Sequence, residues 1–219
     1  MSLRPVLAVA GIVVLTAVVT PHRTDARLVL GLQGGPNLGS AHYDDPMPIW
    51  DPQWDVGFCV GAFTEFGLQD RLSLVPEIRY VRIKNRVDFT PPFRGHFQLT
   101  HEYLSVPVAL RLRVVKNTLF LDAGPDVSVL LSAKSQGEVK HPEFEITTDL
   151  TRDITEVMER WTFALFGGIT FNASSLGPPV EVRVRYAAGV TGAAKEKEWW
   201  SNWKTRELAA ALAFRFEIP

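Results

Sequence analysis

Cysteine is almost absent from this sequence, because Cys59 is the only one among 219 residues. A single cysteine excludes an internal disulfide framework and a cysteine-rich zinc site. An excess of charge is absent as well, since 23 Lys and Arg residues stand against 24 Asp and Glu residues. A nucleic-acid-binding protein usually has a clear basic excess, so this balance argues against that class.

Long apolar runs are also scarce. A mean hydropathy of +0.04 excludes a bundle of membrane-spanning helices. Disorder is equally disfavoured, because 46% of the residues are hydrophobic and only 21% are charged. The length leaves room for one domain or two small ones. By composition alone, the chain is typical of a soluble globular protein.

The motifs of well-known enzymes are missing too. The sequence has no P-loop, no dinucleotide-binding fingerprint and no HExxH zinc motif. We therefore expect no enzyme activity, no cofactor, no bound metal and no nucleic-acid partner. The alternative is a lipid-modifying enzyme, in which His101, Glu102 and Ser105 would lie together at the rim of the β-barrel predicted below. However, four residues of strand separate His101 from Ser105 by roughly 13 Å, too far for a direct contact.

The first 26 residues have the pattern of a secretory signal. Arg4 supplies a positive charge, residues 6–19 are apolar, and Pro21 ends the run. About fourteen apolar residues are fewer than the roughly 20 that a spanning helix needs, so we predict a signal peptide over 1–26 and a mature domain over 27–219. An uncleaved anchor helix is the alternative.

Beyond that segment, apolar residues recur at every second position, which is typical of strands with one apolar face. In residues 102–115, for example, Leu104, Val106 and Leu110 share a face, and Ser105 and Arg111 lie on the other. The pattern predicts eight strands, over residues 27–38, 55–68, 72–84, 102–115, 118–132, 160–172, 180–191 and 204–218. Pro76, Pro107 and Pro125 fall inside predicted strands, where we expect strand ends or bulges.

The connections between these strands alternate between short and long. Residues 69–71, 116–117 and 173–179 are short, whereas 42–54, 85–101, 133–159 and 192–203 are long. This favours an all-β fold: an eight-stranded antiparallel up-and-down transmembrane β-barrel, with short periplasmic turns and long extracellular loops. The connection over 133–159 either extends the adjacent strands or forms a short helix.

The tryptophans support this orientation, because every one falls in or beside a long connection. Indole rings favour the interface between membrane and water. We expect an interface set at the extracellular end, comprising Trp50, Trp54, Trp161, Trp199, Trp200 and Trp203.

The less apolar strand face carries charges of both signs, and we predict that it faces the lumen. Across the hairpin at 116–117, the register sets Arg111 opposite Asp122. An eight-stranded barrel is just wide enough to be filled by side chains, so paired charges would plug it. The predicted lumen network comprises Glu65, Glu77, Arg79, Arg111, Arg113, Asp122, Asp126, Glu181, Arg183, Arg185 and Arg215. A narrow porin or ion path through these charges is the alternative.

Several segments resemble a known family. Residues 34–38 (GGPNL), 72–80 (LSLVPEIRY), 103–110 (YLSVPVAL) and 121–125 (LDAGP) resemble the porin-like outer-membrane β-barrel domain common in Bacteroidetes. The resemblance implies a small barrel in the outer membrane of a Gram-negative bacterium, without an assigned reaction. The implied partners are outer-membrane lipid, lipopolysaccharide, the barrel assembly machinery and other envelope proteins. The end of the chain departs from the pattern, since Phe216 is followed by Glu217, Ile218 and Pro219.

From these observations we expect a non-enzymatic barrel with a structural, adhesive or accessory role carried by its long extracellular loops. A soluble barrel of lipocalin type, holding a ligand inside, is the remaining alternative. It requires an apolar interior and a polar exterior, the inverse of the pattern in these strands.

Overall fold

The computed structural model describes most of the chain after residue 27. The described ranges are 28–43, 50–91, 94–116, 118–140, 147–149, 151–173, 179–194 and 203–218. The predicted signal peptide, residues 1–26, lies outside them. Within these ranges, no helix has both the length and the apolar character needed to cross a membrane.

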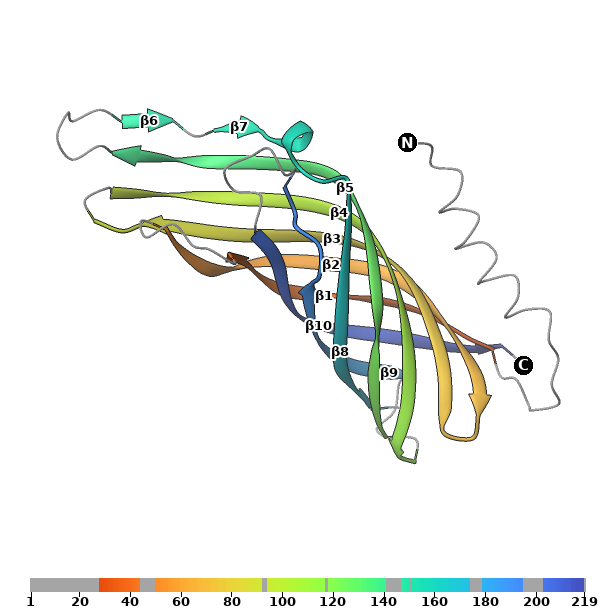
Figure 1. Ribbon diagram of the computed structural model, residues 1–219. Coiled ribbons are helices and arrows are strands. Elements are labelled where there is room, and N and C mark those ends of the chain that lie inside the picture. The colour runs from red at the N-terminus through yellow and green to blue at the C-terminus, as the bar shows by residue number, and fades with distance from the viewer. Residues whose placement is uncertain are drawn as a thin grey trace.

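The described residues form a closed antiparallel ring of eight strands. Figure 1 shows them as the wall of a barrel, which closes where the first strand pairs with the last. The prediction of an eight-stranded antiparallel barrel is therefore confirmed. In ring order the strands are β1 (Leu28–Tyr43), β2 (Trp50–Gln69), β3 (Leu72–Phe89), β4 (Arg94–Val115), β5 (Leu119–Lys140), β8 (Trp161–Asn172), β9 (Val180–Gly189) and β10 (Trp203–Ile218).

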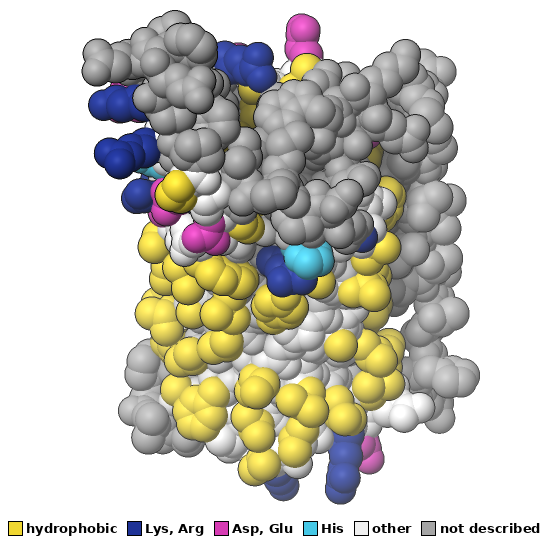
Figure 2. Space-filling model, turned by 60° about the vertical axis from the view of Figure 1, so that its left-hand side comes forward, with side chains coloured by type: hydrophobic (Ala, Val, Ile, Leu, Met, Phe, Trp, Pro, Cys, Tyr) yellow, Lys and Arg dark blue, Asp and Glu magenta, His cyan; other side chains and the backbone are white. Residues whose placement is uncertain are grey.

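Side chains alternate between the two faces of this wall. On β4, Leu104, Val106 and Leu110 are exposed on the outside, whereas Ser105 and Arg111 are buried inside. The same alternation on the other strands builds an outward belt of apolar side chains. In Figure 2 this belt covers the middle and lower part of the barrel, with charged side chains above and below it. A soluble barrel would hide such an apolar surface, so the lipocalin alternative is not supported.

Five strands run further than the sequence pattern predicts. The predicted ends were residues 38, 55, 84, 102 and 132, but β1 extends to Tyr43, β2 begins at Trp50, β3 ends at Phe89, β4 begins at Arg94 and β5 ends at Lys140. Much of the predicted long loops over 42–54, 85–101 and 133–159 is therefore strand. The last of these also contains β6 (Thr147–Asp149), β7 (Arg152–Asp153) and the 3-10 helix η1 (Thr155–Val157).

The prediction of loops over 42–54 and 85–101 was wrong because the polarity of the two faces inverts above the belt, whereas 133–159 both extends β5 and contains a short helix, as the alternatives for that segment stated. On the outer part of β3, Val81, Ile83 and Val87 are buried inside, whereas Lys84 and Arg86 lie outside. Each segment still alternates, but its apolar residues occupy the other face. We call this part of β2, β3, β4 and β5, residues 50–55, 81–89, 94–103 and 130–140, the extension.

An apolar core fills the inside of the extension. Phe97, Leu99 and Ala133 pack there with Ile154 and Met158, which follow β7. Asp153 orders the start of η1, since its carboxylate accepts a hydrogen bond from the Thr155 backbone N–H at 2.8 Å. That bond holds the pKa of Asp153 below its ordinary value. The extension is therefore a packed structure rather than a set of loops.

The wall is much taller on one side than on the other. Strands β4 and β5 have 22 residues each, whereas β8 has 12 and β9 has 10. Figure 1 shows β2 to β5 reaching well beyond β8 and β9 at this end. The rim of the barrel at this end is consequently slanted, with its low side at β8 and β9.

The strand prolines shift no register, although strand pairs are missing directly beside them. Pro76 lies opposite Val108 and Pro107 lies opposite Asp126, with the same register on both sides of each pair. The register shifts of the described strands occur elsewhere, for example between Glu102 and Tyr103. The expectation of bulges at Pro76, Pro107 and Pro125 was therefore wrong.

Candidate functional site

The candidate site is the barrel interior at the height of the apolar belt. Period-two alternation turns every second residue of each strand inward, and there the charged positions of different strands meet. Close strand packing keeps some of these positions small. A side chain on Gly124, for instance, would meet the backbone of Val108 on β4.

Arg111 is the centre of the lower layer of this interior. Its guanidinium donates two hydrogen bonds to Asp122, directly opposite on β5, at 2.7 and 3.1 Å. It also lies 3.0 Å from a Glu65 oxygen and 3.4 Å from a Glu181 oxygen. Arg215 approaches the same two glutamates, at 3.4 Å and 2.5 Å respectively. Five side chains from five strands thus form one ion cluster across the lumen.

The middle layer is built around Glu77. Its carboxylate accepts a hydrogen bond from Arg185 at 2.7 Å and lies 3.4 Å from Arg183. Arg183 continues to Glu181 at 2.7 Å, which joins this layer to the lower one. The Arg183 guanidinium also stacks 3.7 Å from the centre of the Phe63 ring. Ions and aromatic rings together fill the cross-section of the barrel.

The upper layer joins Arg79 to Asp126. The guanidinium donates to the carboxylate at 2.8 Å, and Ser105 donates to the other oxygen at 2.6 Å. All three side chains are buried. Arg79 also lies 3.9 Å from Glu77, so the upper layer continues into the middle one.

Arg113 is the member of the predicted network that lies outside the three ion layers. Its side chain points inward but is half-exposed, and it forms no ion pair with the described residues. It lies near the end of β4, at the mouth with the short turns. The other ten predicted residues meet in the three layers described above.

Sequence reasoning missed Glu207, which is also buried in the lumen. Its position on β10 has the same phase as Arg215, so period-two counting back from Arg215 would have found it. Gln33, Asn37 and Thr170 are buried polar residues of the same kind, and each bonds to a lumen charge. They were missed because uncharged polar residues give a weak signal in an alternating pattern.

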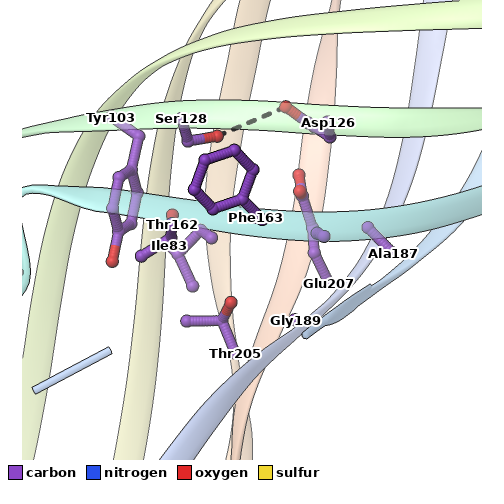
Figure 3. Close-up of a pocket in the computed structure, with 11 residues that line it drawn as sticks. Ile83, Tyr103, Asp126, Ser128, Thr162, Phe163, Ala187, Gly189, Thr205 and Glu207 are labelled. Atoms are coloured by element: carbon purple, nitrogen blue, oxygen red, sulfur yellow. Dashed lines mark hydrogen bonds between the residues drawn. The ribbon is translucent and has the colours of Figure 1, made fainter. Parts of the chain in front are cut away.

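A small cavity of about 30 Å³ lies at the upper end of this interior. Figure 3 shows it between β5, β8 and β10, with Asp126, Ser128, Thr205 and Glu207 around it. It has room for roughly two water molecules. A cavity of this size holds water molecules but is far too small for a larger solute.

The proposed enzyme residues do not converge. Both His101 and Ser105 are buried inside the barrel, and Ser105 is bonded to Asp126. Glu102 points outward, where it lies 3.8 Å from Arg82. The three side chains form no group at a lipid-facing rim.

The strands place four of the six tryptophans toward the tall end of the barrel. Trp54 is exposed and Trp161 is half-exposed, and Trp161 lies opposite Val129 near the upper edge of the belt. The backbone sets Trp50 opposite Phe89 and Trp203 opposite Tyr43. Trp199 and Trp200 lie outside the described residues.

A comparison with protein-family models gives one decisive match. The model described as "Outer membrane protein beta-barrel domain" matches residues 21–194, most of the chain. This protein belongs to the outer membrane protein beta-barrel domain family. The resemblance noted in the sequence is thereby confirmed, and the barrel lies in the bacterial outer membrane, in contact with lipid and lipopolysaccharide. A search of curated proteins finds no significant match.

Solved structures similar to this outer-membrane barrel are also small barrels. Ail of Yersinia pestis is 11% identical with a TM-score of 0.45, and the match covers 86% of this chain and 99% of Ail. Neisserial surface protein A is 13% identical with a TM-score of 0.44 over 85% of this chain and 97% of its own. OprG of Pseudomonas aeruginosa is 11% identical with a TM-score of 0.42 over 88% and 98%.

Proposed function

We propose that this protein is a closed, non-enzymatic outer-membrane barrel that anchors the extension for structural, adhesive or accessory contacts outside the cell. The observation that carries this proposal is the ion network of the lumen. Arg111 and Arg183 each link carboxylates of different strands, and Arg79 pairs with Asp126 above them, in three successive layers. Buried charges of this kind are stable only when they are paired and hydrogen-bonded, which favours a permanent plug.

The extension supports the second half of the proposal. Its outer face carries exposed charged residues such as Arg86, Lys134 and Glu138, and its inner face is packed around Phe97 and Leu99. A rigid sheet that reaches beyond the membrane suits contacts with other envelope proteins or with an external surface. Loops without a core of their own would offer a less ordered surface.

The rest of the proposed biology follows from the location. Residues 1–26 would direct export as a signal peptide and would be removed, leaving residues 27–219. The barrel assembly machinery would insert the mature chain. Trp54 and Trp161 would lie at the upper membrane interface, where an indole ring contacts both lipid and water.

The closed lumen can be tested by conductance measurements in planar lipid bilayers. The refolded protein should insert without producing stepwise currents above those of the bare bilayer. A general porin run in parallel controls for the assay, and heat-modifiable mobility on unboiled gels shows that the same sample is folded. Stable conductance steps from the folded protein would favour the narrow-channel alternative and overturn the proposal.

The role of the extension can be tested in cells by shortening the β3–β4 hairpin, for instance by replacing residues 86–98 with a two-residue turn. We expect a folded barrel with unchanged heat-modifiable mobility but reduced cell adhesion or reduced resistance to detergent. A matched control replaces Lys116 and Asn117, in the turn at the opposite end, with Asn and Gly. If the shortened and full-length proteins behave alike in both assays, the extension does not carry the function.

A further inference from the structure

We propose that the outer face of β10 and β9 binds a phosphate group of the lipid anchor of lipopolysaccharide through Arg206, with Lys204 as a second positive charge. The site lies at the upper edge of the apolar belt, outside the lumen. The inference rests on the outer-membrane location and requires neither a closed lumen nor a role for the extension. Either proposal could therefore fail while the other holds.

Arg206 points out of the barrel. Side chains alternate along β10, where Thr205 lines the lumen cavity and Glu207 is buried inside. Lys204 and Arg206 consequently share the outward face with Leu208, which is exposed in the belt. The guanidinium is thus presented to the surroundings of the barrel and not to its interior.

The height of Arg206 matches the headgroup layer of a membrane. Leu208 pairs with Leu38 on β1 and with Tyr186 on β9, and all three side chains are exposed. Arg206 lies two residues beyond this row, which is roughly 7 Å along the strand and about 5 Å along the axis of a barrel with tilted strands. The headgroup layer on each side of a bilayer is about 5–8 Å deep. In Figure 2, Lys and Arg side chains adjoin the upper edge of the belt.

No described carboxylate neutralises Arg206. On the extension, in contrast, Arg86 lies 2.8 Å from Asp88. The described carboxylates of β9 and β10 are Glu181 and Glu207, and both are buried in the lumen. The described outer face of these two strands is therefore positive at its upper edge and complementary to an anion.

The residues around Arg206 suit a lipid phosphate. Ala188 lies opposite Arg206 on β9, so a small side chain flanks the guanidinium. A guanidinium fork binds two phosphate oxygens with parallel hydrogen bonds. Tyr186, two residues from Ala188 towards the belt, carries the kind of amphipathic ring that favours a membrane interface. Lys204 lies two residues further out and adds a second positive charge.

The apolar neighbours favour a lipid over a free anion. Leu165 lies opposite Ala188 on β8, and it is exposed like Leu208 and Tyr186. A ligand with acyl chains buries them against this surface and brings its phosphate to Arg206 at the same time. In the outer leaflet of the outer membrane that lipid is lipopolysaccharide, whose acylated sugar anchor, lipid A, carries phosphate.

Titration with phosphorylated lipid A tests the site. The full chain is refolded in a zwitterionic detergent, and native mass spectrometry measures the fraction with lipid bound. Arg206→Gln should weaken binding about five-fold, the contribution of one basic residue at an anionic surface. Arg206→Lys, which keeps the charge but lacks the planar fork, should weaken it less.

The matched control is Arg86→Gln, which removes an arginine from the outer face of the extension and should bind lipid A like wild type. Heat-modifiable mobility on unboiled gels shows that each variant is folded. An Arg206→Gln protein that binds lipid A as tightly as wild type would overturn the proposal.

Two further probes separate the phosphate from the acyl chains. Dephosphorylated lipid A should bind wild type about five-fold more weakly, and Arg206→Gln should weaken it no further. Inorganic phosphate should not displace lipid A, because it lacks acyl chains. Equal binding of the two lipids would show that Arg206 recognises no phosphate, and full displacement by inorganic phosphate would assign the site to a free anion; either result contradicts the proposal.

Discussion

The Arg111 guanidinium and the Asp122 carboxylate face each other across the β4–β5 hairpin and share two hydrogen bonds, at 2.7 and 3.1 Å. The same guanidinium reaches Glu65 on β2 and Glu181 on β9. A single arginine thus ties four strands of the ring together, which gives it the largest expected effect on stability.

Replacing this arginine tests the importance of the network. Arg111→Met leaves Asp122, Glu65 and Glu181 with fewer cationic partners in a buried site, which should reduce the free energy of unfolding by about 3–5 kcal/mol. The measurement is denaturant unfolding in lipid vesicles. Arg82→Met is the control, since its pair with Glu102 is half-exposed at 3.8 Å, and it should cost less than about 1 kcal/mol. Equal effects of the two changes would contradict a structural role for the lumen ions.

The outward apolar belt predicts that the stability cost of a charged substitution depends strongly on its position along the barrel. Leu110 is 47% exposed on β4 within the belt, so Leu110→Arg would place a charge in lipid. The expected cost is about 2–4 kcal/mol, measured by reversible unfolding in vesicles. Gln136→Arg on the outer face of the extension, beyond the belt, should change stability by less than about 0.5 kcal/mol. A well-tolerated Leu110→Arg would mean that the belt does not face lipid.

The apolar core inside the extension predicts that the extension can unfold locally while the rest of the barrel stays folded. Phe97→Ala removes a buried ring from the cluster with Leu99, so the extension should open while the belt stays folded. Limited trypsin digestion should then cut at Lys84 and Arg86, with unchanged heat-modifiable mobility of the intact protein. His96→Ala, the outward neighbour, serves as the control and should remain resistant. Loss of the folded gel form with Phe97→Ala would show that the two parts unfold together.

Gly124 on β5 and Gly167 on β8 predict opposite outcomes when each is replaced by alanine. A side chain on Gly124 would meet the carbonyl of Val108, a backbone atom that cannot move without shifting β4. A side chain on Gly167 meets nothing within 4 Å, because that position faces outward. Gly124→Ala should therefore lower the yield of folded barrel on unboiled gels several-fold, and Gly167→Ala should refold like wild type. Equal yields would contradict the close contact of β4 with β5.

The sequence alone determined the barrel, its strand number and the facing of its belt. Period-two alternation is a local property, so the opposed phases of Leu110 and Arg111 can be read without any knowledge of the fold. The phase also assigned Glu77, Arg79 and Asp126 to one face. The bond from Arg79 on β3 to Asp126 on β5 joins strands that are distant in sequence, and only the tertiary structure could set it.

Tertiary structure decided what lies beyond the belt. Val87 and Phe97 alternate with polar residues just as Leu104 and Leu110 do, but the solvent outside them is water instead of lipid, and the apolar face therefore turns inward. A local pattern cannot report which solvent surrounds it. For the same reason Glu207 could be placed in the lumen network only once closure of the barrel set β10 beside β1, where its carboxylate accepts a hydrogen bond from the Asn37 amide at 3.0 Å.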